Sequence, residues 1–324
     1  MSSFHTPVLL KEIIENLKVK KGNQYIDATI GGGGHAVEIL KNGGVVLGID
    51  VDQEAIEHVK KILRDKDIRI LSEKKNESLN ILVSQYPNIT LVRGNFRDID
   101  KIAHLSNFDN VSGIIFDLGV SSYQLETANR GFSFQKIGPL DMRMDQDLGV
   151  SAADLIKVLK KGELYELFTK LGEESRARQF SSSIVRARGI KPIETTRDLA
   201  LVLEGGKGAT SAFARATASK KVFQALRIAV NDELNSIREA LPKAVDLLPR
   251  NGRLLVISFH SLEDRIVKKL FLEFESKGKG EIVTKKPITP SHLEIEINRR
   301  VRSAKLRVFK RSEARYRLAP GEGV

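Results

Sequence analysis

The chain has 324 residues, which is more than one compact core usually holds, so we expect either an elaborated α/β domain or two domains. Hydrophobic residues make up 41% and charged residues 29% of the sequence, as in globular proteins. The sequence contains no cysteine, which excludes disulfides, thiolate metal sites and cysteine nucleophiles. It has no secretion signal and no run of about 18 apolar residues, so we expect a soluble protein that is not exported.

The net charge of +12 indicates an affinity for polyanions such as nucleic acid or anionic membrane. A basic surface can also serve solubility alone. The excess is concentrated near the C-terminus, where only Glu294, Glu296 and Glu313 oppose it, and this favours nucleic acid. The basic residues of this segment are Lys285, Lys286, Arg299, Arg300, Arg302, Lys305, Arg307, Lys310, Arg311, Arg315 and Arg317.

The first third of the chain alternates short β-rich runs with helical stretches, which is typical of a parallel sheet with crossover helices. Four apolar, β-branched runs are predicted to be strands, at 24–30, 45–51, 89–92 and 111–118. Each ends near Gly, Asp or Asn. The carboxyl ends of these strands are therefore candidate ligand contacts.

Residues 125–218 show amphipathic helices without convincing strands. The helices are expected at 152–160, 163–171, 173–188 and 198–203. Capping-box spacing at Ser151 and Asp154, and at Thr195 and Asp198, predicts two helix starts. We interpret this stretch as a helical insertion.

The α/β pattern returns after Lys221. It predicts a helix over 222–248, a strand over 253–259, a helix over 262–275, and closing strands at 281–286 and 306–310. We also expect the charged stretch 71–85 to form a peripheral surface helix. The predicted α/β domain is discontinuous, with residues 1–124 and 219–324 on either side of the insertion 125–218.

The sharpest local motif is DATIGGGGH at residues 27–35, a strand end that leads into a glycine-rich turn and a helix. Glycines let the backbone approach a ligand closely. Gly31, Gly33 and Ala36 also match the G-x-G-x-x-A pattern of dinucleotide-binding proteins, with Asp50 placed to bind ribose. A nicotinamide-dependent oxidoreductase is therefore one reading of this motif.

Two features favour S-adenosylmethionine as the ligand. Asp27 lies just before the glycines, where a carboxylate can accept from an ammonium group but would repel a pyrophosphate. The loop also has no phosphate to neutralise, and Asp50 can accept from both hydroxyls of a ribose. Phe96, after the third strand, could cover the adenine, and Asp117 ends the fourth strand.

Along most of its length the sequence resembles the bacterial 16S ribosomal RNA (cytosine-N4)-methyltransferase family. The motifs that carry the resemblance are HTPVL at 5–9, DATIGGGGH at 27–35, GIDVD at 48–52, DLGVSSYQ at 117–124, RGFSF at 130–134, GPLDMRMD at 138–145, GEE at 172–174, FQALRI at 223–228, SFHSLEDR at 258–265, TKKP at 284–287 and RSAKLR at 302–307.

The resemblance implies methylation of the N4 amine of a cytidine in the decoding region of 16S ribosomal RNA. It implies an α/β protein with a class I S-adenosylmethionine methyltransferase (Rossmann-like) sheet and an inserted all-helical domain for substrate recognition. We expect the protein to act in the cytoplasm, on RNA of the small subunit. The resemblance also implies a cofactor set, to which Asp27 and Gly31 are added from the reasoning above. That set is Gly33, Gly34, His35, Asp50, Phe96, Asp117 and Gln124.

The chemistry is displacement at a methyl carbon and requires no metal. Because the cytosine N4 is a poor nucleophile, the site needs an acceptor for its hydrogens, and Asp117 is the first candidate. Ser121 could orient the base, although a turn or cap hydroxyl is an equal alternative. His260, after the fifth core strand, could reach the base or could cap the following helix.

Two departures from the family pattern stand out. Residues 217–222 replace the usual His-Pro-Ala-Thr-Arg-Thr run, and the segment 63–87 is longer than usual.

Besides the oxidoreductase, a second alternative function is a non-catalytic module that binds RNA or assists ribosome assembly.

Overall fold

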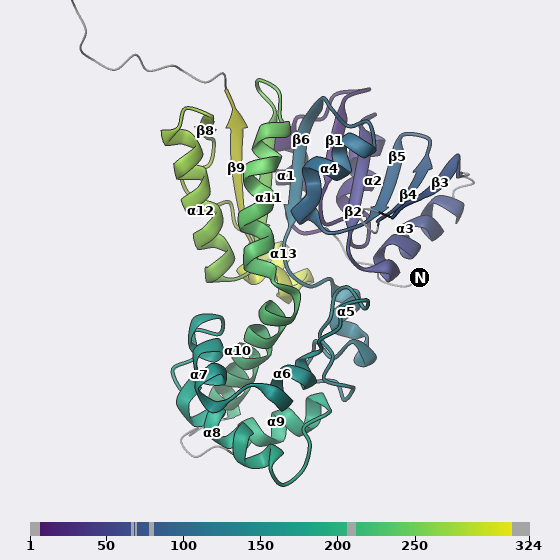
Figure 1. Cartoon of the computed structure of the whole chain (residues 1–324). Helices are drawn as coiled ribbons and strands as arrows, with labels where there is room; N and C mark the ends of the chain where they lie inside the picture. The colour runs from purple at the N-terminus through teal and green to yellow at the C-terminus, as the bar shows by residue number, and fades with distance from the viewer. Residues whose placement is uncertain (1–6, 66–67, 69, 78–80, 206–211, 313–324) are drawn as a thin grey trace, which may run out of the picture. The chain divides into compact units, whose positions relative to one another are not determined.

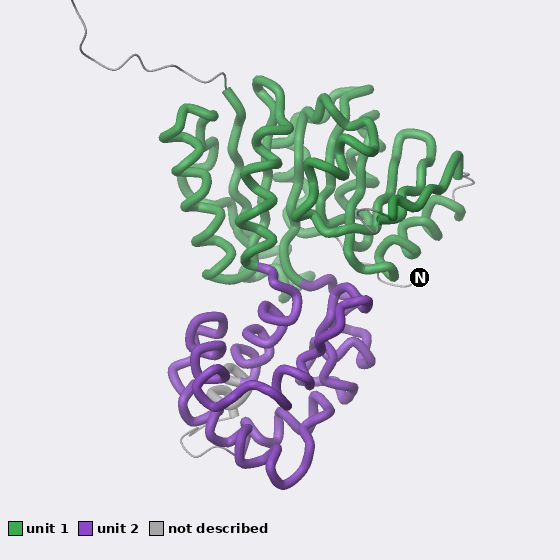
Figure 2. The backbone as a smooth tube through the Cα atoms, viewed as in Figure 1, with its two compact units in different colours: residues 1–119, 234–324 green, residues 120–233 purple. Residues whose placement is uncertain are grey.

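The computed structural model describes residues 7–65, 68, 70–77, 81–205 and 212–312, with backbone only at 212–218. The chain forms two compact units (Figure 2). The first comprises residues 1–119 and 234–324, and the second comprises residues 120–233. Each unit has its own buried apolar core.

The first unit is built on a nine-stranded sheet in the described part of the chain, with the order β3-β4-β5-β2-β1-β6-β7-β9-β8. The five central strands are parallel, whereas both edges are antiparallel. The strands are β1 (Gln24–Asp27), β2 (Val45–Asp50), β3 (Ser72–Asn76), β4 (Ile81–Tyr86), β5 (Ile89–Arg93), β6 (Val111–Asp117), β7 (Arg253–Ser258), β8 (Gly280–Ile282) and β9 (Lys305–Arg311). The predicted α/β architecture with a central parallel sheet is confirmed.

Helices cover both faces of this sheet because its central strands are apolar on both sides. Ile13 of α1, Ile39 of α2 and Val59 of α3 are buried in one cluster with the strand residues of one face. Across the other face run α4 and α11 (Figure 1). The helices are α1 (Leu10–Leu17), α2 (Gly34–Lys41), α3 (Gln53–Asp65), α4 (Ile99–Leu105), α11 (Glu233–Leu247), α12 (Ser261–Ser276) and α13 (His292–Ile297), with short 3₁₀ turns η1 (Phe96–Asp98) and η3 (Arg299–Ser303).

The expected surface helix at 71–85 is wrong: this stretch contains the antiparallel hairpin β3–β4. A tight turn at Asn88, with φ of 61°, returns β4 along β5, and Ile81, Ser84 and Tyr86 are buried. Buried Lys60 of α3 fixes the hairpin through Glu73 at 2.6 Å. Charge along the sequence suggested a helix, but pairing with the sheet edge decided the structure.

The second unit is helical. Its elements are α5 (Ser122–Glu126), η2 (Ala128–Arg130), α6 (Ala152–Val158), α7 (Lys161–Lys170), α8 (Ala177–Arg188), α9 (Thr196–Glu204) and α10 (Ala212–Asn231). Both predicted capping boxes are present, at Ser151 with Asp154 and at Thr195 with Asp198. Within the described residues of both units, no helix is long and apolar enough to span a membrane.

Helix α10 crosses the expected boundary at 218/219 and packs against α6, α7 and α9. The single helix expected over 222–248 is wrong, because the chain breaks it into α10 and α11 at Asp232, with φ of 48°. Aspartate tolerates this left-handed conformation better than most residues. The divergent segment 217–222 is helical backbone in α10, and the side chains of 217 and 218 lie outside the described residues.

Several basic residues near the C-terminus are used inside the first unit. The guanidinium of Arg307 is 2.6 Å from Asp264 in α12, and Lys305 is 3.2 Å from the same carboxylate. Lys310 pairs with Glu281 at 2.9 Å. Arg315 and Arg317 lie outside the described residues. Part of the basic segment therefore joins β9 to α12 and β8.

The Asp264–Arg307 pair predicts a large loss of stability on Asp264→Ala. Both side chains are largely buried, with 14% and 9% exposed, so removing the carboxylate leaves a buried cation without its partner. The free energy of unfolding should fall by about 3 kcal/mol in urea denaturation. Glu281→Ala, which breaks an exposed pair, should cost less than about 1 kcal/mol. Equal losses in the two variants would contradict this reading.

Candidate active site

The parallel pairing of strands brings three aspartates together at the carboxyl ends of the central strands of the first unit. Asp27 ends β1, Asp50 ends β2 and Asp117 ends β6. The register pairs Asp27 with Gly48 of β2 and with Ile115 of β6. Asp50 and Asp117 therefore each lie two residues beyond the position that pairs with Asp27. Carboxyl ends of parallel strands are where α/β folds bind ligands.

The glycine-rich turn connects β1 to α2 at these strand ends. Gly31 and Gly33 have φ of 47° and 78°, values that glycine adopts without strain. Gly34 begins α2, and a Cβ atom there would lie 2.3 Å from Cγ of Pro7. Glycine is thus required at 31 and 33 by backbone conformation and at 34 by close packing.

Asp27 is almost fully buried, with 1% exposed. Its carboxylate accepts hydrogen bonds from the backbone amides of Thr29, at 3.3 Å, and Ala36. Burial, together with the charge of Asp50, raises the pKa of Asp27 to about 7. A positively charged ligand group nearby would stabilise the ionised form of Asp27 and lower this pKa.

Asp50 connects the second strand end to the glycine turn. Its two carboxylate oxygens accept from the amides of Gly31 and Asp52, each at 2.9 Å. Burial first, and then the charge of Asp52, raise its pKa to about 6. A carboxylate has about four acceptor positions, so these two bonds leave capacity for hydroxyl donors.

Asp117 lies beside the same turn. Its amide donates to the hydroxyl of Thr29 at 2.7 Å, while its Oδ1 is buried with no hydrogen-bond partner among the described residues. Burial, followed by the charges of Asp27 and Glu263, raises the pKa of Asp117 to about 8. A buried acceptor without a partner is costly unless a ligand supplies a donor.

His35 lies 4.0 Å from Asp117, measured from its Nδ1 to Oδ2. Its Nε2 is 3.0 Å from the carbonyl oxygen of Val8, so Nε2 carries the proton and Nδ1 is an acceptor. Burial lowers the pKa of His35 to about 4, so the ring is neutral near pH 7. His35 therefore offers Asp117 a neutral neighbour rather than a counter-ion.

The other predicted residues of the first unit lie at neighbouring strand ends. Phe96 follows β5, and its half-buried ring packs edge-on against Phe116 at 5.5 Å. His260 follows β7 and caps α12, with its Nδ1 accepting from the amide of Glu263 at 3.4 Å. The cap expected as one alternative for His260 is thus present.

Ser121 and Gln124 belong to the second unit, where they form a capping box at the start of α5. The Ser121 amide donates to the side chain of Gln124 at 3.0 Å, and the Gln124 amide donates to Ser121 Oγ at 3.1 Å. Their cap role is therefore observed. Their proposed roles toward cofactor and base stay predictions.

The polar groups at the carboxyl ends of these strands fit a cationic ligand with hydroxyl groups. Asp27, Asp50 and Asp117 offer carboxylates, and the glycine turn presents backbone amides without a lysine or arginine among these residues. A pyrophosphate would find no basic side chain among these residues. An ammonium and the hydroxyls of a ribose can donate to the carboxylates, and a sulfonium is attracted to their negative charge.

Comparison with known proteins decides the family. The family model described as MraW methylase family matches residues 2–312. The chain belongs to this family. Full-length relatives named ribosomal RNA small subunit methyltransferase H are similar throughout: 42% identity for the one from Carboxydothermus hydrogenoformans, covering 95% of this chain and 97% of the relative. Those from Persephonella marina and Halothermothrix orenii are 44% and 41% identical, covering 95% of this chain and 99% and 98% of their own lengths.

Membership in this methylase family confirms the resemblance inferred from the motifs, but two contributors to the site were missed. Thr29 connects Asp117 to the glycine turn, and its place inside the 27–35 motif was the available signal. Glu263 lies in the SFHSLEDR motif but was not among the predicted site residues. It is fully buried and accepts from the amides of Phe259 and His260, at 2.8 and 3.2 Å, and its charge raises the pKa of Asp117.

The raised pKa of Asp117 predicts a pH-dependent stability. With a pKa of about 8 when folded and an ordinary value near 3.8 when unfolded, the folded chain binds more protons between these limits. The free energy of unfolding therefore falls as the pH rises from about 4 to about 8, and Asp117→Asn should reduce this fall. Urea denaturation of cofactor-free protein at about pH 5 and about pH 8 measures it.

Asp109→Asn, which changes an acid with 68% of its side chain exposed, is the control and should retain the full pH dependence. If Asp117→Asn kept the same pH dependence as the unchanged chain, its carboxyl would not carry a raised pKa.

Proposed function

We propose that this chain methylates the N4 amine of a cytidine in the decoding region of 16S ribosomal RNA, with S-adenosylmethionine as methyl donor, in the cytoplasm and on the small ribosomal subunit. Family membership supports a methylase, and relatives named for the small-subunit RNA support this substrate. The observation that carries the chemistry is the buried Oδ1 of Asp117 beside the glycine turn, which has no hydrogen-bond partner among the described residues.

When bound, S-adenosylmethionine supplies a methyl group activated by a sulfonium. We assign Asp27 to its ammonium group, directly or through water, and Asp50 to its ribose hydroxyls. Gly31, Gly33 and Gly34 let the backbone approach, and the ring of Phe96 covers the adenine. His35 and Gln124 complete the proposed set, as the family motif implies.

Asp117 is the proposed acceptor for the hydrogens of N4. An N4–H bond directed at Oδ1 orients the nitrogen lone pair toward the methyl carbon, and this alignment supplies much of the rate. The proton that N4 loses can pass to Asp117, whose raised pKa suits it to hold that proton. A positive charge beside the carboxylate favours its ionised form before transfer. We keep His260 and Ser121 as further candidates for orienting the base.

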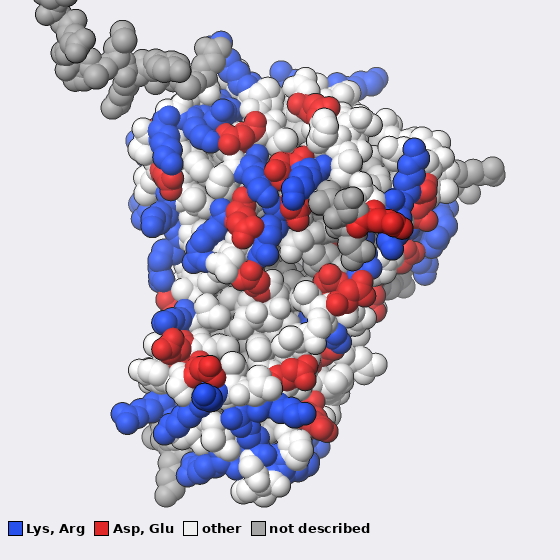
Figure 3. All heavy atoms as spheres, viewed as in Figure 1, with Lys and Arg blue, Asp and Glu red and all other residues white. Residues whose placement is uncertain are grey.

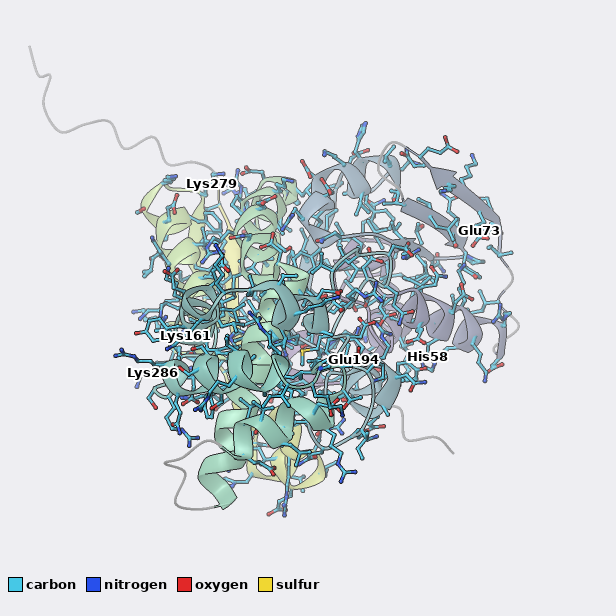
Figure 4. All side chains as sticks on the ribbon, turned by 60° about the horizontal axis from the view of Figure 1, so that its bottom comes forward. His58, Glu73, Lys161, Glu194, Lys279 and Lys286 are labelled. Atoms are coloured by element: carbon cyan, nitrogen blue, oxygen red, sulfur yellow. The ribbon has the colours of Figure 1, made fainter. Side chains whose placement is uncertain are left out.

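We propose that the helical second unit and the basic C-terminal segment bind the RNA. Exposed cations of the second unit include Lys157, Lys160, Lys161, Arg178 and Arg186, and blue side chains gather over this unit in Figure 3. In the C-terminal segment, Lys285, Lys286, Arg299, Arg300 and Arg302 are exposed, and Lys286 extends away from the ribbon in Figure 4. Such cations bind phosphates and make affinity salt-dependent.

The direct test of this function is methyl transfer to small ribosomal subunits that lack the modification. Radiolabelled S-adenosylmethionine, followed by mapping of the product, should place the label on N4 of a single decoding-region cytidine. Label on another base or on protein would refute the proposal. Naked 16S RNA, assayed in parallel, tests whether the assembled subunit is the substrate.

Calorimetry separates the two alternatives from this proposal. A non-catalytic RNA module would bind RNA but not S-adenosylmethionine, and an oxidoreductase would bind a nicotinamide dinucleotide. The strand-end site opposes the second alternative, since it combines three aspartates with a glycine turn that has no lysine or arginine to neutralise a pyrophosphate.

Asp50→Ala should weaken binding of S-adenosylhomocysteine by about tenfold or more, because each hydrogen bond to a charged group contributes roughly 1.5–3 kcal/mol. Titration calorimetry measures the change. Glu15→Ala, at an exposed acid of α1, is the control with the same loss of charge. Unchanged affinity in Asp50→Ala would remove Asp50 from the cofactor set.

The pair Arg299→Glu and Arg302→Glu should weaken RNA binding and flatten its dependence on salt, while affinity for S-adenosylhomocysteine stays unchanged. Lys74→Glu with Lys75→Glu, on the exposed hairpin strand β3, makes the same change of charge and should have a smaller effect. Equal effects of the two pairs would indicate nonspecific attraction, and loss of both ligands would indicate misfolding.

A further inference from the structure

Residues 7–9 lie against the glycine-rich turn through three different contacts. The ring of Pro7 packs on Gly34 so closely that a Cβ atom at 34 would lie 2.3 Å from its Cγ. The carbonyl oxygen of Val8 is 3.0 Å from Nε2 of His35. Leu9 is fully buried in the core cluster that contains Ala36 and Ile39 of α2. Residues 7–9 therefore pack against the turn and against the start of α2.

The same segment is also held by Glu294. Oε1 of Glu294 accepts a hydrogen bond of 2.7 Å from the backbone amide of Leu9, which is 285 positions away in the sequence. Leu9 has φ of 53°, a left-handed conformation that leucine rarely adopts, and its carbonyl accepts from the amide of Ile13 to start α1. A charged acceptor aimed at this amide stabilises the unusual backbone there.

Glu294 is itself fixed by its helix. Its amide donates to Oγ of Ser291, which caps α13 at 3.2 Å. After α13 the chain continues into η3, where Val301 is buried. The carboxylate is thus presented to Leu9 from an anchored element of the C-terminal segment.

We propose that Glu294 is a positioning residue that docks residues 7–9 onto the glycine-rich turn and so sets the affinity of that turn for the cofactor. The inference rests on the proposed function, because it takes the turn as the cofactor site. It gives the C-terminal segment a role in cofactor binding that is separate from its exposed cations. Glu294 touches neither reacting group and acts through the backbone of Leu9, Val8 and Pro7.

The first experiment is hydrogen exchange of the full chain without ligand, comparing Glu294→Ala with Glu296→Ala. Glu296 is an exposed acid on the same helix, so the control matches both charge and helix propensity. We expect faster exchange in Glu294→Ala for peptides covering residues 9–17 and 31–41, and no change in the control. Identical exchange in the two variants would overturn the docking role.

The second experiment measures affinity for S-adenosylhomocysteine by calorimetry and then the kinetics of methyl transfer. Loss of the hydrogen bond from Glu294 to Leu9 should weaken the affinity by about twofold to tenfold. KM for S-adenosylmethionine should rise by a similar factor. kcat at saturating cofactor and the affinity for RNA should stay unchanged. Glu294→Gln keeps an acceptor oxygen and should restore most of the affinity. A fall in kcat without a change in KM would contradict a positioning role.

If Glu294→Ala does not fold, Glu294→Asp compared with Glu296→Asp gives the same contrast, because the shorter side chain withdraws the oxygen and keeps the charge. Failure of the unchanged chain to bind S-adenosylhomocysteine would count against the proposed function. Hydrogen exchange needs no cofactor and so judges the docking of residues 7–9 by itself.

Discussion

The parallel pairing of β1 with β2 and β6 is the constraint on which the site depends. It places Asp27, Asp50 and Asp117 together at the carboxyl ends of these strands although they are far apart in the sequence. Hydrogen bonds then connect the strand ends, from the Gly31 amide to Asp50 and from the Asp117 amide to Thr29. A shift of either pairing by one residue would turn the aspartates to the opposite face.

Burial of several acids together explains why this site suits a cationic ligand. Each carboxylate loses solvation and is also repelled by its neighbours, so the pKa values of Asp27 and Asp117 rise to about 7 and about 8. Hydrogen bonds from backbone amides reduce the free-energy cost of ionising a buried carboxyl, as they do for Asp27 and Asp50. A bound sulfonium and ammonium would offset the remainder, so cofactor binding and the ionisation of the site should be linked.

The sequence predicted the parts of this structure that depend on local pattern. Apolar runs that end in Asp or Gly located the central strands, and the Ser151 and Thr195 capping boxes were correct in detail. It failed at 71–85, where pairing with β5 decides a hairpin, and at Asp232, where the backbone breaks a helix. The contacts of Thr29, Glu263 and Glu294 depend on elements brought together by folding, so spacing could not reveal them.

The proposed mechanism depends on Asp117 accepting a hydrogen bond from the amine that is methylated. A structure with S-adenosylhomocysteine and cytidine bound tests it most directly, because it locates N4 relative to every carboxylate of the site. We predict that N4 lies within about 3.2 Å of Oδ1 of Asp117 and that the ribose of the cofactor contacts Asp50. A cytidine whose N4 is bonded elsewhere, with Asp117 still without a partner, would contradict the proposed mechanism.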